Sequence, residues 1–549
     1  MSENLIAQAY AYPLLLKQLW LGSLQHSAEQ EIVYRGQVRH TYRQTYQRVS
    51  QLAHVLAARG VKMGDTVAVM DWDSHRYFES YFAVPMMGAV LFNVNVRLAA
   101  DQILYTLNHA KPKVLLLNRE FLAVVEAIAP ELTSVETIIV LNDEDKAPQT
   151  TLTIDGEYEA LLAAAGDAPY DFADFDENTR ATTFYTTGTT GLPKGVFFSH
   201  RQLVLHTLST ATALGTSAHH GRMHREDVYM PITPMFHVHA WGFPYLATML
   251  GLKQVYPGRY VPEQLLGLIE SEKVTFSQCV PTILHMLLKN PQAEHTSRLR
   301  GLKMVIGGAA MPAGLALDAL NRGMDIFTGY GMSETCPILT LAQLTEAELA
   351  LPASEQVPLR ARTGQSIPLV DLRVVDPQLN EVAHDEKTAG EVVVRSPWLT
   401  QGYSQNPEAS AELWAGGYLH TNDIGVMNER GSLRVTDRLK DVIKTGGEWI
   451  SSLELESRLS EHEAVNEVAV IAVPDSKWGE RPLALVVLNA GMTPEVAEPA
   501  LRAHLAAVVE AGHLSKWAVP DEIRFVESLT RTSVGKLNKL AMRKQFIPS

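Results

Sequence analysis

Cysteine is scarce in this sequence: Cys279 and Cys336 are the only two among 549 residues. They stand far apart in apolar surroundings and do not form the spaced framework that stabilises small secreted proteins through disulfides. A reducing compartment is therefore expected, and the protein is predicted to be cytoplasmic.

Long hydrophobic runs are also missing. The apolar stretch Tyr10–Leu21 is interrupted by Lys17 and Gln18, and it is too short and too mixed to cross a bilayer. The residues before it contain no basic group, which the start of a secretory signal would have. We predict no transmembrane segment and interpret Tyr10–Leu21 as a packing or dimer-contact helix.

Positive charge is in deficit as well. The 47 lysines and arginines are outnumbered by 61 aspartates and glutamates, which gives a net charge of −14. An acidic protein repels phosphate backbones, so the composition argues against a general nucleic-acid-binding role. Internal repeats, heptads and low-complexity segments are absent. The chain does have ample apolar residues, 46% of the total, over a length that requires two or more domains.

The most informative stretch is Tyr185–Gly195, Tyr-Thr-Thr-Gly-Thr-Thr-Gly-Leu-Pro-Lys-Gly. A β-branched and aromatic strand is predicted before it, over 181–185, and a helix is predicted after it, from near Arg201. Glycines let the backbone approach a ligand, while N–H groups, hydroxyls and the Lys194 ammonium suit a polyphosphate. The same composition also fits a mobile surface loop.

The spacing of this stretch differs from that of a Walker A loop, in which Gly, four residues and Gly-Lys-Ser/Thr follow one another. Pro193 stands five residues after Gly188, and Lys194 is followed by Gly195. The pattern therefore argues against a P-loop nucleoside triphosphatase.

Five further motifs follow in order along the chain. They are Met235-Phe-His-Val-His-Ala-Trp-Gly242, Gly329-Tyr-Gly-Met-Ser-Glu-Thr335, Thr421-Asn-Asp423, Asp437-Arg-Leu-Lys-Asp-Val-Ile-Lys-Thr-Gly-Gly-Glu-Trp449 and Arg531-Thr-Ser-Val-Gly-Lys536. With the Tyr185–Gly195 stretch they resemble the motifs of the adenylate-forming superfamily, which contains acyl-CoA synthetases, the adenylation domains of peptide synthetases and firefly-type luciferases. The resemblance covers most of the chain, and six motifs in order are much more specific than one.

Predicted strands and helices alternate along much of the chain. Buried strands are expected over 65–71, 113–118, 135–141, 273–280 and 302–306, with helical patterns between them. This alternation predicts an α/β fold with parallel or mixed sheets covered on both faces. Short strands over 372–375, 390–395 and 432–436 indicate a small β-rich subdomain.

The domain organisation follows from this pattern. We predict a large N-terminal domain, 1–436, with two α/β sheet subdomains and the small β-rich subdomain. A compact α+β C-terminal domain, 437–549, follows it. The resemblance implies that this C-terminal domain is mobile and turns about a hinge near Lys440.

An ATP site with Mg²⁺ is implied by the resemblance. Glu334 would be the carboxylate ligand of the metal, a catalytic role, and Thr186 would offer a hydroxyl to the metal or the phosphates. Tyr330 would stack on the adenine and Asp423 would take the ribose hydroxyls. Asn422 stands where the family usually has glycine, and it tolerates a positive φ. The other ATP- or AMP-binding residues implied are Thr187, Gly188, Thr189, Thr190, Lys194, Gly308, Ala309, Gly329, Gly331, Ser333, Arg438, Lys440, Lys444 and Trp449.

Lys536 is the central catalytic residue of the first half-reaction that the resemblance implies. A positioned ammonium stabilises the negative charge that grows on the phosphoryl group and on the leaving pyrophosphate. The family usually has proline before Arg531, whereas this chain has Thr530. For the second half-reaction, the resemblance implies that Gly446 and Gly447 face coenzyme A after the C-terminal domain has rotated.

His237 and Trp241 are predicted to contact the acid substrate, and His237 is also predicted to be a catalytic residue. Their motif resembles that of medium- and long-chain fatty-acyl-CoA synthetases, in which the histidine lies near the acyl carboxylate and the tryptophan gates the fatty-acid tunnel. Gly308 would line the same acyl pocket. The aromatic-rich segment also fits a core helix with satisfied histidines. A histidine cluster has no metal-ligand spacing and receives no role; it comprises His219, His220 and His224.

The resemblance implies an AMP-forming acid–thiol ligase that uses Mg²⁺, ATP and coenzyme A to convert a small-molecule carboxylic acid, first among them a medium- or long-chain fatty acid. A homodimer is expected. Other substrates stay open, including an aromatic acid or a short acid such as methylmercaptopropionate. Two other functions stay open as well: a luciferase-like oxygenase and a stand-alone enzyme that hands its acyl-AMP to a carrier protein.

Overall fold

The structure is a computed structural model, and it describes residues 10–144, 146–186, 192–218, 220–445, 448–512, 514–532 and 536–547, without the side chains of Glu448 and Trp449. Part of the predicted nucleotide site therefore lies outside the described residues, namely Thr187, Gly188, Thr189, Thr190 and the Trp449 side chain. The same holds for the predicted coenzyme A contacts, Gly446 and Gly447.

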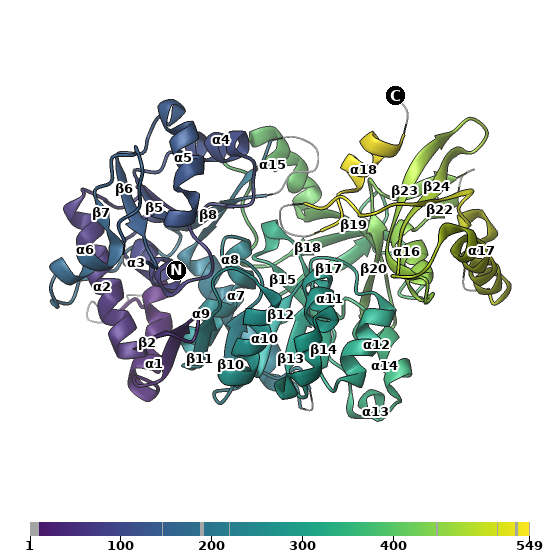
Figure 1. Ribbon diagram of the computed structural model, residues 1–549, viewed down its shortest axis with the longest axis horizontal. Coiled ribbons are helices and arrows are strands. Elements are labelled where there is room, and N and C mark those ends of the chain that lie inside the picture. Colours follow the sequence, from purple (N-terminus) through teal and green to yellow (C-terminus); the bar gives the residue numbers. More distant parts are fainter. Residues whose placement is uncertain are drawn as a thin grey trace, which may run out of the picture.

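A seven-stranded sheet occupies the N-terminal end of the molecule (Figure 1). Its pairs are parallel except for the antiparallel pair β8–β9 at one edge. The inner strand β5, Val-Leu-Leu-Leu-Asn, is buried along its whole length because both faces of the sheet are covered. The strands, in spatial order, are β7 (Gly156–Glu157), β6 (Thr137–Leu141), β5 (Val114–Asn118), β3 (Thr66–Met70), β4 (Val90–Asn93), β8 (Arg180–Tyr185) and β9 (Gly195–Ser199).

A nine-stranded sheet forms the middle of the molecule (Figure 1). Its pairs from β14 to β1 are parallel, and antiparallel strands extend both edges. The strands, in spatial order, are β16 (Gln365–Ser366), β15 (Ile338–Leu341), β14 (Asp325–Gly331), β13 (Lys303–Ile306), β12 (Phe276–Cys279), β10 (Val228–Pro231), β11 (Lys253–Tyr256), β1 (Glu31–Tyr34) and β2 (Val38–Thr41). The two sheets confirm the predicted pair of α/β subdomains.

Helices cover the sheets and join them. α3 (His75–Met86) contacts strands of both sheets, and α7 (His200–Thr216) contacts β9 of the first and β15 of the second. α7 begins where Ser199 and Gln202 accept hydrogen bonds from each other's backbone N–H, which satisfies two donors that the first helical turn leaves open. The other helices of the large domain are α1 (Leu19–His26), α2 (Tyr42–Ala58), α4 (Ala100–Ala110), α5 (Leu122–Ile128), α6 (Tyr158–Ala164), α8 (Val238–Trp241), α9 (Phe243–Leu250), α10 (Pro262–Ser271), α11 (Pro281–Lys289), α12 (Ala313–Asn321), α13 (Glu346–Leu349), α14 (Ala353–Arg360) and α15 (Pro407–Leu413).

The β-rich subdomain is a four-stranded antiparallel sheet. Its strands, in spatial order, are β17 (Asp371–Val375), β18 (Gly390–Arg395), β19 (Leu419–Met427) and β20 (Leu433–Arg438). Three of these strands were predicted. The prediction missed β19, an inner strand, because the polar run Thr421-Asn-Asp423 interrupts its apolar pattern.

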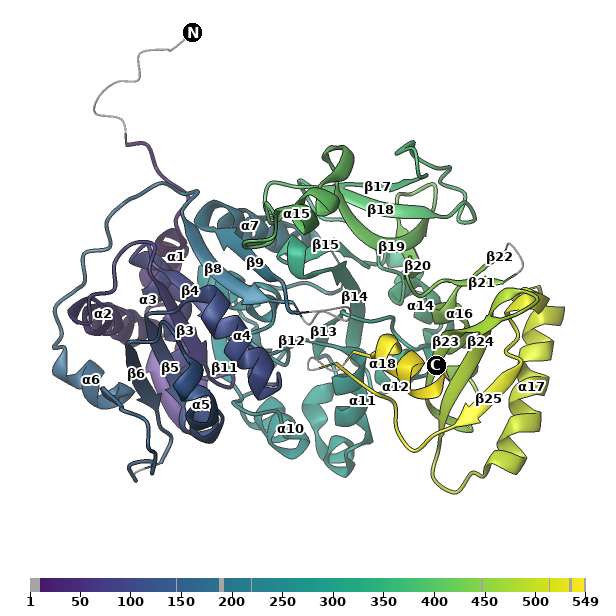
Figure 2. The same cartoon turned by 90° about the horizontal axis from the view of Figure 1, so that it is seen from above.

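The C-terminal domain has its own sheet and its own apolar cores, as expected of a separate domain. Figure 2 shows α17 (Pro494–Glu510) on the outer side of this sheet and α18 (Lys539–Phe546) on the side that faces the large domain. Its remaining elements are β21 (Ile443–Thr445), β22 (Glu448–Ile450), α16 (Ser452–Ser460), β23 (Val465–Asp475), β24 (Gly479–Leu488) and β25 (Glu522–Phe525).

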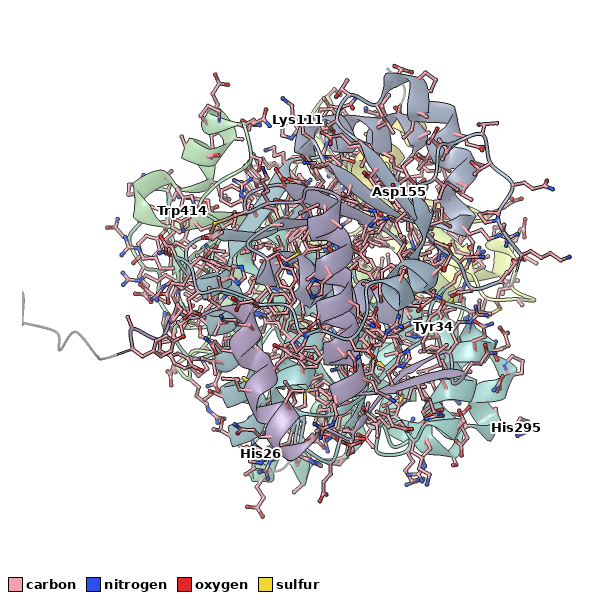
Figure 3. All side chains as sticks on the ribbon, turned by 90° about the vertical axis from the view of Figure 1, so that its left-hand side faces the viewer. His26, Tyr34, Lys111, Asp155, His295 and Trp414 are labelled. Atoms are coloured by element: carbon pink, nitrogen blue, oxygen red, sulfur yellow. The ribbon has the colours of Figure 1, made fainter. Side chains whose placement is uncertain are left out.

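The N-terminal helix begins later than predicted. Residues 10–15 form no helix, and a 3₁₀ turn at Leu16–Gln18 leads into α1, which ends at the labelled His26 in Figure 3. Pro13 disfavours a helical conformation at Tyr12, the residue before it. The segment does pack as expected, since Trp20 is fully buried. Within the described ranges, we find no helix that is both long and apolar enough to cross a membrane.

The turn after β13 leads into α12. Pro312 has an extended conformation and stands immediately before this helix, whose first residue is Ala313. The helix α14 (Ala353–Arg360) was not predicted, because its sequence mixes polar residues with Pro358.

Candidate active site

A pocket lies at the carboxyl ends of β13 and β14 in the large domain, where ligands bind in open α/β sheets. Lys536, from the C-terminal domain, closes one side of it. We call it the central pocket. Its lining consists of His237, Val238, Trp241, Val305, Gly307, Gly308, Gly329, Tyr330, Gly331, Met332, Ser333, Pro337, Ile338 and Lys536. Eight of the residues predicted for the site, Trp241 among them, therefore line this pocket although they come from distant parts of the sequence.

Two glycines at the end of β13 allow the walls of the central pocket to approach each other. A Cβ atom on Gly307 would lie 2.8 Å from the Gly329 carbonyl oxygen and 3.1 Å from the ring of Trp241. A Cβ atom on Gly308 would lie 3.2 Å from Cε of Lys536, and the φ angle of Gly308 is +78°. Larger residues would block the lysine. Ala309 follows and is exposed.

Tyr330 lies between two glycines at the end of β14. Its hydroxyl donates a 2.8 Å hydrogen bond to Oδ2 of Asp423, and burial raises the pKa of the tyrosine well above its usual value. A Cβ atom on Gly331 would fall 1.7 Å from the carbonyl oxygen of Pro337, so only glycine fits there. The predicted adenine-stacking and ribose-binding residues are thus neighbours.

Asp423 contacts residues of two other motifs, Tyr330 and Arg438. It is 5% exposed, and its Oδ1 lies 3.2 Å from Nε of Arg438 on the adjacent strand β20. Asn422 before it has a φ of +57°, so the predicted tolerance of this turn for asparagine is confirmed. A buried carboxylate beside a guanidinium keeps two acceptor oxygens close to the pocket residue Tyr330.

Glu334 is held by a residue that the sequence analysis did not select. Its Oε1 accepts a 2.7 Å hydrogen bond from the hydroxyl of Tyr403, and the carboxylate is buried. Burial raises the pKa of Glu334, which the Tyr403 hydrogen bond and the nearby Arg438 and Lys194 oppose. The only sequence signal for Tyr403 was an aromatic residue beside Gly402.

Thr186 and Lys194 close the base of the phosphate-loop stretch. The backbone N–H of Thr186 donates to the carbonyl oxygen of Lys194 at 2.9 Å, and the Lys194 N–H donates to the Thr186 hydroxyl at 3.3 Å. The Lys194 ammonium lies over the ring of Tyr403, 4.7 Å from its centre. The Thr186 hydroxyl, the Lys194 ammonium and the Glu334 carboxylate therefore lie on one side of the site.

Lys536 is anchored through the loop that carries it. Nη1 of Arg531 donates to Oγ1 of Thr282 on α11 at 2.8 Å, and Nη2 pairs with Glu467 at 2.7 Å. Burial, with a further contribution from Arg438, lowers the pKa of Lys536 to about 8. The loop thus ties the C-terminal domain to the large domain and presents a lysine to the pocket.

Lys440 and Lys444 do not line the central pocket in this orientation of the domains, as far as the described lining shows. Burial lowers the pKa of Lys440, which lies between β20 and β21. Lys444 is exposed on β21, and its backbone N–H donates to Glu480 of the C-terminal domain.

His237 precedes an unusual turn. Four consecutive non-glycine residues, Val238–Trp241, have positive φ angles between 48° and 61°, so α8 is one left-handed turn. Each such residue costs about 1–2 kcal/mol. This turn places the Trp241 ring against Gly307. Burial and the nearby Lys536 lower the pKa of His237 to about 3, so its imidazole is neutral.

His239, the second histidine of the same motif, has a structural role. Nε2 of His239 lies 2.8 Å from Oγ1 of Thr182, and aromatic rings surround it. Of the histidine cluster, His220 is buried, bonds Asp325 at 3.1 Å and accepts from the Leu344 N–H. His219 lies outside the described residues.

Family models match most of the chain. Residues 23–404 match the AMP-binding enzyme model, and residues 454–536 match the model of the AMP-binding enzyme C-terminal domain. The chain therefore belongs to the AMP-binding enzyme family.

Two curated relatives are similar to the chain over most of its length, and one solved structure shares its fold. It is 43% identical over 518 residues to a long-chain-fatty-acid–CoA ligase of Thermus thermophilus, covering 94% of this chain and 92% of the relative. It is 39% identical over 501 residues to a 3-methylmercaptopropionyl-CoA ligase of Ruegeria pomeroyi, covering 90% of each. The anthranilate CoA ligase AuaEII in complex with anthranoyl-AMP has the same fold, with a TM-score of 0.85, 23% identity and 98% coverage of both chains.

Proposed function

We propose that this protein is an AMP-forming acyl-CoA ligase. It joins a carboxylic acid to AMP with release of pyrophosphate and then transfers the acyl group to coenzyme A. The observation that carries this proposal is Lys536, which reaches over Gly308 into a pocket that also contains Tyr330 and its partner Asp423. The names of the two curated relatives, both acid–CoA ligases, support it.

In the first half-reaction a carboxylate oxygen attacks the α-phosphorus of ATP, and the bond from that phosphorus to the pyrophosphate oxygen breaks. Negative charge grows on the transferred phosphoryl group and on the leaving pyrophosphate. The Lys536 ammonium is placed to stabilise that charge in the transition state. The neutral His237 imidazole lines the same pocket and offers a hydrogen bond to the acid without a competing charge.

The nucleotide would be held from both ends of the site. Asp423 offers two acceptor oxygens for the ribose hydroxyls, with Arg438 fixing it in place. Tyr330, Gly329, Gly331 and Ser333 form the wall for the adenine and the α-phosphate. Lys194 and the phosphate-loop stretch would bind the β- and γ-phosphates.

The residues present fit a magnesium ion. Glu334 supplies a buried carboxylate whose pKa is raised by burial, so a nearby cation would relieve an unfavourable charge. Thr186 supplies a hydroxyl on the same side of the site, and both are the hard oxygen ligands that Mg²⁺ prefers. When bound, the ion neutralises phosphate charge.

The second half-reaction requires Lys536 to leave the central pocket. We propose that the C-terminal domain begins after β20 (Leu433–Arg438), so that Asp437 stays in the sheet of the large domain. This C-terminal domain turns about Lys440, which lies between β20 and β21, the first C-terminal strand. Gly446 and Gly447 would then line the path of the coenzyme A thiol. The thiolate attacks the acyl carbon, the carbon–oxygen bond breaks, and AMP leaves.

The preferred acid is a medium- or long-chain fatty acid. Apolar residues of the central pocket, Val238, Val305 and Ile338, favour an aliphatic chain beside the reacting carboxylate. The name of the Thermus relative supports a long chain, while that of the Ruegeria relative supports a short sulfur-containing acid as the second candidate. We further propose a homodimer, and a cytoplasmic location because both cysteines are buried and unpaired.

Replacing Trp241 by Ala will extend the range of acids towards longer chains. The ring closes the pocket against Gly307, and its removal frees that space. The ratio of kcat/KM for long over short aliphatic acids will rise at least about tenfold, the scale of one to two methylenes in an apolar pocket. Trp478→Ala, outside the pocket lining, is the matched control. An unchanged acid profile in Trp241→Ala would remove the residue as a gate.

The rate of adenylate formation will depend on the charge of Lys536. Its pKa is lowered to about 8, so the ammonium is present below that pH and is lost above it. The kcat/KM for ATP, which reports the free enzyme, will therefore fall as the pH rises through about 8. In Lys536→Arg the residual activity will lack this fall, because a guanidinium stays protonated. A wild-type rate that is level up to the ordinary lysine pKa would contradict this assignment.

A panel of acids tests the proposed function as a whole. Pyrophosphate release from ATP is measured for aliphatic acids of increasing length, aromatic acids and methylmercaptopropionate, with and without coenzyme A, while thioesters are detected by mass. Thioester formation from aliphatic acids is the expected result. Pyrophosphate without thioester would overturn coenzyme A as acceptor, and light emission with a luciferin and oxygen would favour the luciferase-like alternative.

A further inference from the structure

A buried carboxylate outside the central pocket spans the junction of the two domains. Asp437 is 1% exposed. Its Oδ2 accepts hydrogen bonds from the backbone N–H of Ser452 at 2.6 Å and from the Ser452 hydroxyl at 2.7 Å. Its Oδ1 accepts from the N–H of Arg438 at 2.7 Å. The carboxylate therefore satisfies the first turn of a helix, where negative charge is favourable.

The two partners belong to different domains. Asp437 lies on β20 and pairs with Ile424 of β19, inside the sheet of the large domain. Ser452 is the first residue of α16, which packs into the core of the C-terminal domain through Leu455. The contact lies on either side of Lys440, the proposed pivot.

A buried ion pair supports Ser452 from the C-terminal side. Nζ of Lys539 donates to the Ser452 hydroxyl at 2.7 Å and pairs with Glu456 at 2.6 Å. Glu456 also accepts from the backbone N–H of Val470. Lys539, Glu456 and Val470 all move with the C-terminal domain. Asp437 is the member of this network that belongs to the large domain.

The same orientation of the domains puts Lys536 over Gly308. A turn about Lys440 that withdraws Lys536 must separate Asp437 from Ser452 and leave a buried carboxylate without these two donors. Breaking hydrogen bonds to a charged group is unfavourable. The Asp437–Ser452 contact therefore favours the arrangement that adenylate formation needs.

We propose that Asp437 is a positioning residue for the first half-reaction, which holds the C-terminal domain where Lys536 enters the central pocket. This proposal rests on the proposed function. Loss of the carboxylate shifts the domains towards other orientations, so it slows adenylate formation and spares thioester formation.

The test measures the two half-reactions separately in Asp437→Ala. Adenylate formation, followed as pyrophosphate release without coenzyme A, will fall about 10- to 100-fold, the loss of two hydrogen bonds to a charged group. Thioester formation from synthetic acyl-AMP and coenzyme A will stay within about twofold of wild type or rise. A parallel loss in both half-reactions, or no loss in either, would overturn the proposal.

Glu456→Gln is the matched control. It weakens the same buried lysine pair but does not cross the pivot. It will lower the midpoint of thermal unfolding without changing the ratio of the two half-reaction rates. If Glu456→Gln changes that ratio as much as Asp437→Ala does, the effect is one of general stability, and the positioning role is wrong.

A distance measurement keeps the inference testable if the wild-type protein forms no acyl-AMP. Spin labels are attached at Glu355→Cys on α14 and Val496→Cys on α17, two exposed positions on different domains, with the buried Cys279 and Cys336 left in place. The distance distribution without ligands will broaden in Asp437→Ala and stay unchanged in Glu456→Gln. An unchanged distribution in Asp437→Ala would contradict the proposal whatever the enzyme's activity.

Discussion

Replacing Lys536 by Ala will lower the rate of pyrophosphate release from ATP and acid by about 10²- to 10³-fold, the usual loss when one positioned charge-stabilising group is removed. The ammonium reaches the pocket over Gly308, where we propose that it meets the nucleotide at the atoms on which negative charge develops. The KM for ATP will change much less than kcat, because the interaction strengthens in the transition state.

The partial reactions give this experiment its control. Thioester formation from synthetic acyl-AMP will continue in Lys536→Ala, because we propose that the lysine has left the central pocket in that step. Lys544→Ala, an exposed lysine on α18 of the same domain, will leave both steps unchanged. If Lys536→Ala lowers both half-reactions equally, the lysine does not act at the first step alone.

Glu334→Gln is expected to show the second large effect. An amide of the same shape removes the negative charge that would hold the metal, so kcat/KM for adenylate formation will fall on the order of 10²-fold. The Mg²⁺ concentration for half-maximal rate will rise at least about tenfold. Both are measured as pyrophosphate release at fixed ATP over a range of free Mg²⁺.

Tyr403→Phe tests the orientation of the Glu334 carboxylate separately from its charge. It removes the 2.7 Å hydrogen bond to Glu334 and keeps both the charge and the aromatic ring under Lys194. A loss of about tenfold or less, with a smaller shift in Mg²⁺ dependence, is expected. Equal effects from Glu334→Gln and Tyr403→Phe would mean that Glu334 has only a structural role and does not hold the metal.

The parts of the site that the sequence could predict are those in short, continuous motifs. Gly329–Thr335 is one strand end and one 3₁₀ turn, so its order of residues almost fixes its geometry. The same is true of Gly308, which follows the predicted apolar strand 302–306 closely. The alternation of strands and helices likewise predicted both large sheets.

What the sequence could not predict depends on contacts between distant segments. Tyr403 and Glu334 are 69 residues apart in the sequence, and the residues next to them do not indicate that the two side chains are hydrogen-bonded. The left-handed turn Val238–Trp241 contradicts local preference, since valine, alanine and tryptophan all avoid positive φ. Tertiary packing around the buried Ala240 and Trp241 must hold it in place.

The orientation of the two domains also could not be predicted from the sequence. The motif Asp437–Trp449 resembled a hinge, but the resemblance gave no role to Asp437 itself. Its partner Ser452 and the supporting Lys539 come from two helices separated by most of the C-terminal domain. A buried network of this kind becomes visible only when β20, α16 and α18 are packed together.

An isotope measurement tests the central claim most directly. The acid that turns over best in the panel is prepared with ¹⁸O in both carboxylate oxygens and incubated with the protein, Mg-ATP and coenzyme A. Because the carboxylate attacks the α-phosphorus and the thiol later breaks the carbon–oxygen bond, each thioester formed will leave one ¹⁸O atom in AMP. AMP without the label, or ADP and phosphate as products, would contradict an acyl-adenylate on the path to the thioester.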